Sequence, residues 1–149
     1  MDPLAEATLA QLEETHEDLR RIVRDLPAEA LNWSPGEEMN SIYVLVTHLL
    51  GSQRFWLSAA LGETIERDRE AEFRVHGASA DDLMSLLDEA DARNREMLAR
   101  LRPDMLSATF TGHRESHSGA WCLIHAMEHT GQHHAHAAMT RQLWEQQKQ

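Results

Sequence analysis

The stretch that decides the fold is residues 41–61, which read SIYVLVTHLLGSQRFWLSAAL. Its apolar residues recur at helical spacing, and they occupy more than one face of the predicted helix. Four of them face away from His48: Tyr43, Val46, Leu50 and Leu57. A helix that is apolar all round is buried on more than one side. We therefore expect a central helix that packs against its own chain and also against a second copy in a homodimer.

Three further segments carry a helical pattern: residues 4–26, about 80–101 and 119–147. Asn40 is a plausible cap for the central helix and Gly62 its stop, while Ser79-Ala-Asp-Asp82 resembles a capping box. The connections at 62–78 and 103–117 are long and polar, and long connections permit crossovers. The sequence thus predicts an all-α fold, a four-helix bundle with crossover-type connections and no sheet, as one domain over residues 1–149.

The charge, the cysteine count and the apolar runs of the chain disfavour several classes of partner and location. The chain has 149 residues and a net charge of −11, which disfavours binding to nucleic acids and to anionic membranes, while a cation is a natural ligand. One cysteine, Cys122, excludes an intramolecular disulfide framework and fits a reducing cytosol. No apolar run approaches the ~18 residues of a membrane span, and the N-terminus lacks the pattern of a signal peptide. We expect a cytoplasmic protein.

Histidines cluster in the last predicted helix. Six of the ten fall between residues 117 and 136, and His129 and His133 are four residues apart, on one helix face. With His125 at zero angle, His129, His133 and His136 lie at about 40°, 80° and 20°. Because apolar residues share this sector, we expect it to face the bundle interior. His134 should lie on the opposite face, in solvent.

His48 shares its face of the central helix with apolar residues, so it should also point into the core. Burying imidazoles without partners costs about 1–3 kcal/mol each, and a metal ion satisfies one nitrogen of each ring. His125 and His136 could add a fourth ligand or hydrogen-bond to one. His16 could approach the same site from the first helix.

The chain resembles the DinB-like superfamily of bacterial helical-bundle metalloenzymes. Three motifs carry the resemblance: Leu31-Asn-Trp33-Ser-Pro35, Thr47-His48-Leu49 followed by Phe55-Trp56-Leu57, and His129-x-x-x-His133. The resemblance covers nearly the whole chain. It implies a homodimeric four-helix bundle in which His48, His129 and His133 bind one divalent metal, zinc or nickel. Many members continue the last histidine with Arg-Gly-Gln, whereas this chain reads His134-Ala-His136.

The resemblance also implies a reaction class. Some members are transferases or isomerases that use a low-molecular-weight thiol such as mycothiol or bacillithiol, and we expect a metal-dependent transferase, isomerase or hydrolase acting on a small molecule. The alternative is a protein that binds metal or a small ligand without turnover. No general base can be identified beyond the metal-bound group.

Three other interpretations stay open. His125-Ala-Met-Glu128-His129 matches the His-x-x-Glu-His signature of inverted zinc proteases, in which both histidines bind zinc and the glutamate activates water. Cys122 could supply a thiolate ligand, although a small buried apolar residue is its commoner role. Three polar residues before the last helix could line the mouth of a site: His113, Glu115 and His117.

Overall fold

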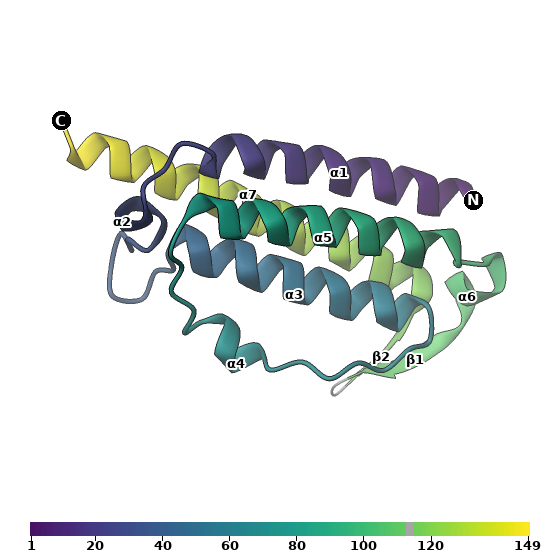
Figure 1. The fold of residues 1–149 in the computed structure, drawn as a ribbon. Coiled ribbons are helices and arrows are strands. Elements are labelled where there is room, and N and C mark those ends of the chain that lie inside the picture. The colour runs from purple at the N-terminus through teal and green to yellow at the C-terminus, as the bar shows by residue number, and fades with distance from the viewer. Residues whose placement is uncertain (113–114) are drawn as a thin grey trace.

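The computed structural model describes residues 1–112 and 115–149, and it is a four-helix bundle (Figure 1). The four long helices are α1 (Pro3–Val23), α3 (Ile42–Ala60), α5 (Ala80–Ala99) and α7 (Gly119–Gln147). Both α1 and α3 pack against α5 and α7, so α1 lies diagonally across the bundle from α3. The predicted all-α fold is confirmed, and each long helix matches its predicted segment to within a few residues at either end. None of the described helices is long and apolar enough to cross a bilayer.

The connection between α3 and α5 is a crossover. Figure 1 shows both helices running in the same direction, so residues 61–79 must return along the length of the bundle before α5 begins. This segment contains the short helix α4 (Arg69–Glu72), and two more short helices, α2 (Ala28–Leu31) and α6 (Pro103–Ser107), lie in the other connections. Each of the three connections between the long helices therefore contains a short helix.

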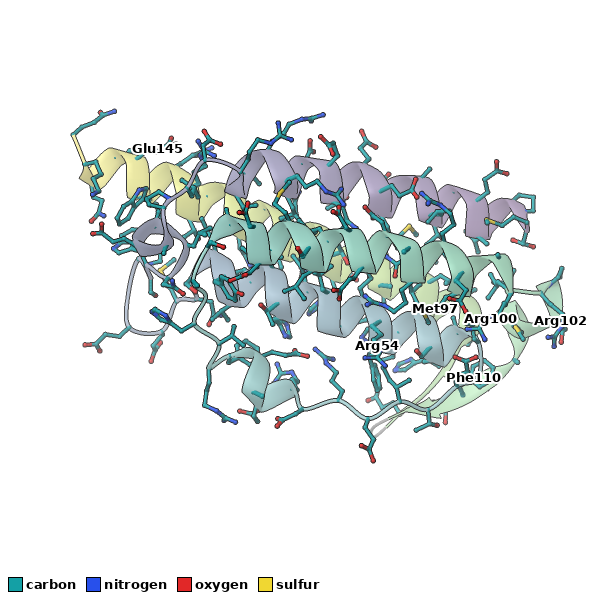
Figure 2. All side chains as sticks on the ribbon, viewed as in Figure 1. Arg54, Met97, Arg100, Arg102, Phe110 and Glu145 are labelled. Atoms are coloured by element: carbon teal, nitrogen blue, oxygen red, sulfur yellow. The ribbon has the colours of Figure 1, made fainter. Side chains whose placement is uncertain are left out.

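A small hairpin corrects the expectation that the fold contains no sheet. Strands β1 (Thr109–Gly112) and β2 (Glu115–Ser118) pair antiparallel, with Thr109 opposite Ser118. Strands of four residues are too short to show a period-two pattern, and the hairpin depends on contact with the bundle. Phe110, labelled in Figure 2, packs on Gly62, where a Cβ atom would lie 2.5 Å from the phenyl Cε1. Gly62 ends α3 with φ +74°, a conformation that favours glycine.

The caps differ in detail from the predicted ones. Ser41, and not Asn40, caps α3, because its Oγ accepts a hydrogen bond from the Val44 N–H at 3.2 Å. Ser79 lies at the N-cap of α5, but its side chain makes no capping hydrogen bond. Ser118 ends β2 and caps α7 in the same way as Ser41 caps α3.

The core consists of two apolar clusters with a polar layer between them. One cluster is centred on residues such as Leu19 and Leu87 and the other on Leu12 and Leu123. Each long helix contributes one buried polar residue to the layer: His16, Gln53, Asn94 and Thr130. The Gln53 amide donates to His16 Nε2 at 3.0 Å and to Thr130 Oγ1 at 3.2 Å, and its Oε1 accepts from the Asn94 amide.

His16 belongs to this layer and not to the histidine cluster of α7. Its Nδ1–H donates to Asp91 Oδ1 at 2.6 Å, and Asp91 in turn pairs with Arg20. Both ring nitrogens of His16 therefore have protein partners, and the expectation that His16 could approach the metal site was wrong.

The apolar residues on the far side of α3 are buried within a single chain. Tyr43, Val46, Leu50 and Leu57 are each 9% exposed or less, because α5, α7 and the crossover segment surround α3. These four residues therefore give no support to a dimer. The homodimer stays a prediction that rests on the family resemblance.

Candidate metal centre

Three imidazoles meet where α3 packs against α7. His48 of α3 lies beside His129 and His133 of α7, and one ring nitrogen from each lies within 4.8 Å of the others. The Nε2 atoms of His129 and His133 are 3.2 Å apart, and the ring of His48 lies 5.0 and 4.8 Å, between centroids, from the rings of His129 and His133. His48 is buried and the other two are half-buried, so the cluster lies at the edge of the core. The structure thus brings together the three predicted ligands.

The other histidines of α7 lie outside the cluster because the buried face of the helix is rotated from the predicted one. Taking His125 as zero, the buried residues of α7 centre near 100°, as shown by Ala126 and Trp144. His133, at about 80°, points inward, whereas His125 and His136 lie at the solvent edge. The predicted inward sector was therefore wrong by about a quarter turn.

Each outlying histidine has its own surroundings. His125 stacks on Trp121 at 4.6 Å between centroids and packs edge-on against Trp56. The exposed His136 has its Nδ1 3.4 Å from His133 Nδ1. His134 is half-buried, with Nε2 3.9 Å from an Asp18 carboxylate oxygen, and is less exposed than expected.

Two residues that sequence reasoning missed hold the outer side of His48. The Nδ1–H of His48 donates to Glu72 Oε1 at 2.9 Å, and Arg67 pairs with both oxygens of Glu72 at 2.8 Å. Both residues belong to the crossover, which carries little apolar pattern. One feature of the sequence indicates that another segment approaches α3 near His48: Gly51 lies inside the helix one turn after His48, where a glycine lowers helix stability.

Burial keeps the three imidazoles neutral. Burial, followed by the charges of neighbouring histidines, lowers the pKa of His129 to about 3 and that of His133 to about 4. Burial also lowers the pKa of His48, and the hydrogen bond to Glu72 opposes this shift. At neutral pH each ring therefore has one nitrogen lone pair free for a cation.

These residues fit a divalent metal. Because a carboxylate only accepts hydrogen bonds, His48 carries its proton on Nδ1, and its Nε2 lone pair is free. His129 and His133 already direct their Nε2 atoms at each other, and a cation between them satisfies both. Over residues 1–112 and 115–149, no fourth histidine, cysteine or carboxylate joins the three. A metal held here would keep open coordination positions.

The structure does not favour the protease-like motif or Cys122 as sources of metal ligands. Glu128 of the protease-like motif is 63% exposed and lies beside His125, which stacks on Trp121 and is not part of the cluster. Cys122 is buried in an apolar cluster, and burial raises the pKa of its thiol, as for a small apolar residue.

Of the three residues expected at the mouth of a site, His117 stacks on Trp121 at 3.6 Å between centroids. Glu115 is exposed, and His113 lies outside the described residues. His117 thus extends a row of rings that runs through Trp121 and His125 towards His129.

Comparisons with known proteins agree with this fold. YfiT from Bacillus subtilis, described as a probable metal-dependent hydrolase with an unusual four-helix bundle topology, is similar at a TM-score of 0.72 and 18% identity, over 94% of this chain and 87% of that one. A conserved protein from Enterococcus faecalis matches at 0.77 and 16% identity, over 93% and 95%. A DinB-like protein from Bacillus subtilis, YjoA, matches at 0.70 and 20% identity, over 95% and 90%.

No curated protein sequence matched the chain. The family model of the DinB superfamily matches residues 11–137, a span that contains all four long helices in whole or in large part and all three clustered histidines. The chain therefore belongs to the DinB superfamily.

Proposed function

We propose that this protein is a metal-dependent enzyme whose zinc or nickel ion is held by His48, His129 and His133. The observation that carries the proposal is the convergence of three neutral imidazoles with no fourth protein ligand among the described residues. Structural metal sites are closed by four protein ligands, whereas catalytic sites keep a position open. A divalent ion held here would lower the pKa of a thiol or a water molecule that it binds.

The reaction class that we propose is transfer of a low-molecular-weight thiol to an electrophile, with hydrolysis as the related possibility that the description of YfiT suggests. In the transfer, the thiol sulfur forms a bond to an electrophilic carbon of the second substrate, the bond from that carbon to its leaving group breaks, and the leaving group takes the electron pair and the proton that the thiol releases. Positive charge beside the site supports an anionic reactant. The Arg69 guanidinium lies over Phe73, 4.9 Å from the ring centroid, and Phe73 packs on His48 at 4.6 Å between centroids.

An aromatic wall gives the second substrate a surface next to His129. His117, Trp121 and His125 stack in a row, and Trp56 packs edge-on against all three. Trp121 is 38% exposed, so its ring is open to a ligand. We assign to this wall the apolar part of the substrate.

The second candidate function is binding of a metal or small ligand without turnover. It is favoured by the lack of a free general base near the cluster among the described residues, since the carboxylate of Glu72 is occupied by Arg67 and His48. Thiol-dependent turnover by the metal-loaded protein would decide for the enzyme.

Metal content of purified variants tests the site. We expect about one divalent ion per chain in the parent and a sharp loss in His133→Ala, which removes one of three ligands. His134→Ala is the matched control, because it changes the adjacent histidine, whose ring pairs with Asp18 and lies outside the cluster. Equal metal content in the parent and both variants would refute the assignment.

Binding of a thiol is tested separately in cobalt-substituted protein. A thiol that coordinates the metal should produce a sulfur-to-cobalt charge-transfer band, which His133→Ala should lose. A spectrum unchanged by any thiol would remove the transferase proposal and leave the metal site standing.

A further inference from the structure

Glu72 is buried beside the histidine cluster although it comes from the crossover and not from a helix of the bundle. It is 9% exposed, and both of its carboxylate oxygens are engaged. Oε1 accepts from His48 Nδ1 at 2.9 Å and from Arg67 Nη2 at 2.8 Å, and Oε2 accepts from Arg67 Nε at 2.8 Å. Arg67 thus holds the carboxylate in a bidentate pair, which fixes its orientation as well as its position.

The bundle has a space that fits this carboxylate. A Cβ atom at Gly51 would lie 2.1 Å from Glu72 Oε2 and 2.7 Å from its Cδ, so only glycine leaves room for the side chain. A glycine inside a helix costs about 1 kcal/mol relative to alanine. Gly131, inside α7, has nothing within 4 Å of its Cβ position and shows no such fit. The presence of glycine at position 51 is therefore explained by contact with Glu72.

The hydrogen bond to Glu72 gives His48 a property that the other two cluster histidines lack. A carboxylate accepts only, so the proton of the neutral ring must be on Nδ1, and Nε2 is left as the lone-pair nitrogen. By contrast, His129 Nδ1 is buried without a hydrogen-bond partner among the described residues, and His133 Nδ1 faces only the exposed His136. His48 is the cluster histidine whose tautomer and ring orientation are fixed by the protein.

We propose that Glu72, held by Arg67 in the space above Gly51, is the positioning residue of the metal centre. It acts through His48, whose Nε2 it presents to the cluster in the form that binds a cation. The inference rests on the proposed function because it assumes that the cluster binds a metal. The tautomer of His48, however, is a property of the metal-free protein and can be measured without metal. The crossover thereby becomes part of the site, although it supplies no ligand.

Two measurements on three variants test this role. The variants are Glu72→Ala, the isosteric Glu72→Gln, and Glu70→Ala as a control on the same short helix, where Glu70 is 75% exposed. The ¹⁵N chemical shifts of the His48 ring in metal-free protein report its tautomer, and competition with a chromophoric chelator gives the zinc affinity. Far-ultraviolet circular dichroism establishes that each variant is folded.

We expect the parent and Glu70→Ala to show His48 protonated on Nδ1. Glu72→Ala should shift the proton towards Nε2 and weaken zinc binding about 10- to 100-fold, the usual range for such outer partners. Glu72→Gln keeps an acceptor oxygen, so it should restore the tautomer and part of the affinity. If Glu72→Ala fails to fold, Glu72→Gln still tests the positioning role, because the proposal requires that it bind zinc more weakly than the parent.

If Glu72→Ala folds and keeps both the His48 tautomer and the zinc affinity of the parent, Glu72 is not a positioning residue. If Glu72→Ala does not fold, the same conclusion follows when Glu72→Gln binds zinc as tightly as the parent. A parent that binds neither zinc nor nickel would instead refute the proposed function. In that case the tautomer of His48 still tests the contact with Glu72, so the two failures can be told apart.

Discussion

Replacing Gly51 with alanine should destabilise the protein, although the same change in most helices stabilises. The new Cβ would lie 2.1 Å from Glu72 Oε2, well inside van der Waals contact. The carboxylate is the end of a flexible side chain, but Arg67 and His48 hold it in place. The side chain must therefore either leave its site or force α3 and the crossover apart.

The magnitude follows from two opposed effects. Alanine gains up to about 1 kcal/mol in helix propensity over glycine. Displacing Glu72 breaks charge-assisted hydrogen bonds worth about 1.5–3 kcal/mol each and leaves His48 Nδ1 without its acceptor. The side chain of Glu72 is 11% exposed, so solvent screens these interactions little in the folded state, although the released carboxylate regains water. We expect a net loss of about 1–3 kcal/mol in the free energy of unfolding.

Urea denaturation of metal-free protein measures the effect, with Gly131→Ala as the control. Gly131 has open space around its Cβ position, so its substitution should raise stability by up to about 1 kcal/mol. The two variants should therefore differ by about 1–4 kcal/mol and move the urea midpoint in opposite directions. If Gly51→Ala were as stable as Gly131→Ala, the space above Gly51 would not be occupied by Glu72 and the explanation of this glycine would be wrong.

Three further predictions concern the rest of the molecule. The free energy of unfolding of the metal-free protein should fall as the pH drops from about 6.5 towards 4. The reason is that histidines of the unfolded chain take up protons near pH 6.5, whereas the pKa values of His129 and His133 in the folded protein are about 3 and about 4. Urea denaturation at pH 7 and pH 5 measures this loss, and equal stability at the two pH values would contradict it. Gln53→Leu should lower the free energy of unfolding by about 3 kcal/mol or more, because each of His16, Asn94 and Thr130 loses a hydrogen-bond partner. The control Gln142→Leu, on the exposed face of α7, should change it by less than about 0.5 kcal/mol. We also expect a homodimer, and a monomeric mass in light scattering at micromolar concentration would count against it.

The long helices could be predicted because their residues carry repeated signals. Apolar spacing indicates α1, α3 and α5, and the helix breakers Pro27, Gly62 and Pro103 each stand shortly after the last residue of one of these helices. The hairpin could not be predicted in the same way, because each strand has only four residues and depends on contacts such as that of Phe110 with Gly62. Tertiary contact, and not local pattern, determines those elements.

The candidate site was predictable in part. The i,i+4 spacing of His129 and His133 indicates a shared face, and the family resemblance adds His48. The interior direction of α7 could not be predicted well, because histidines and apolar residues mix on several of its faces. Glu72 was missed because a contact between α3 and a segment 24 residues away leaves no periodic trace.

The polar layer in the core also fixes how the helices can slide past one another. A shift of α3 by one turn, about 5.4 Å, would move Gln53 into one of the leucine-rich clusters and break its hydrogen bonds with His16, Asn94 and Thr130. A shift of any other long helix would break the bond of its own polar residue to Gln53. Two uniform clusters of leucine and alanine would tolerate such a slip far better. Because His129 and His133 sit beside Thr130 on α7, and His48 lies just over one turn from Gln53 on α3, the same layer aligns the two halves of the histidine cluster. Sequence changes in this layer should therefore appear first as misalignment of the histidines, before any loss of helix content.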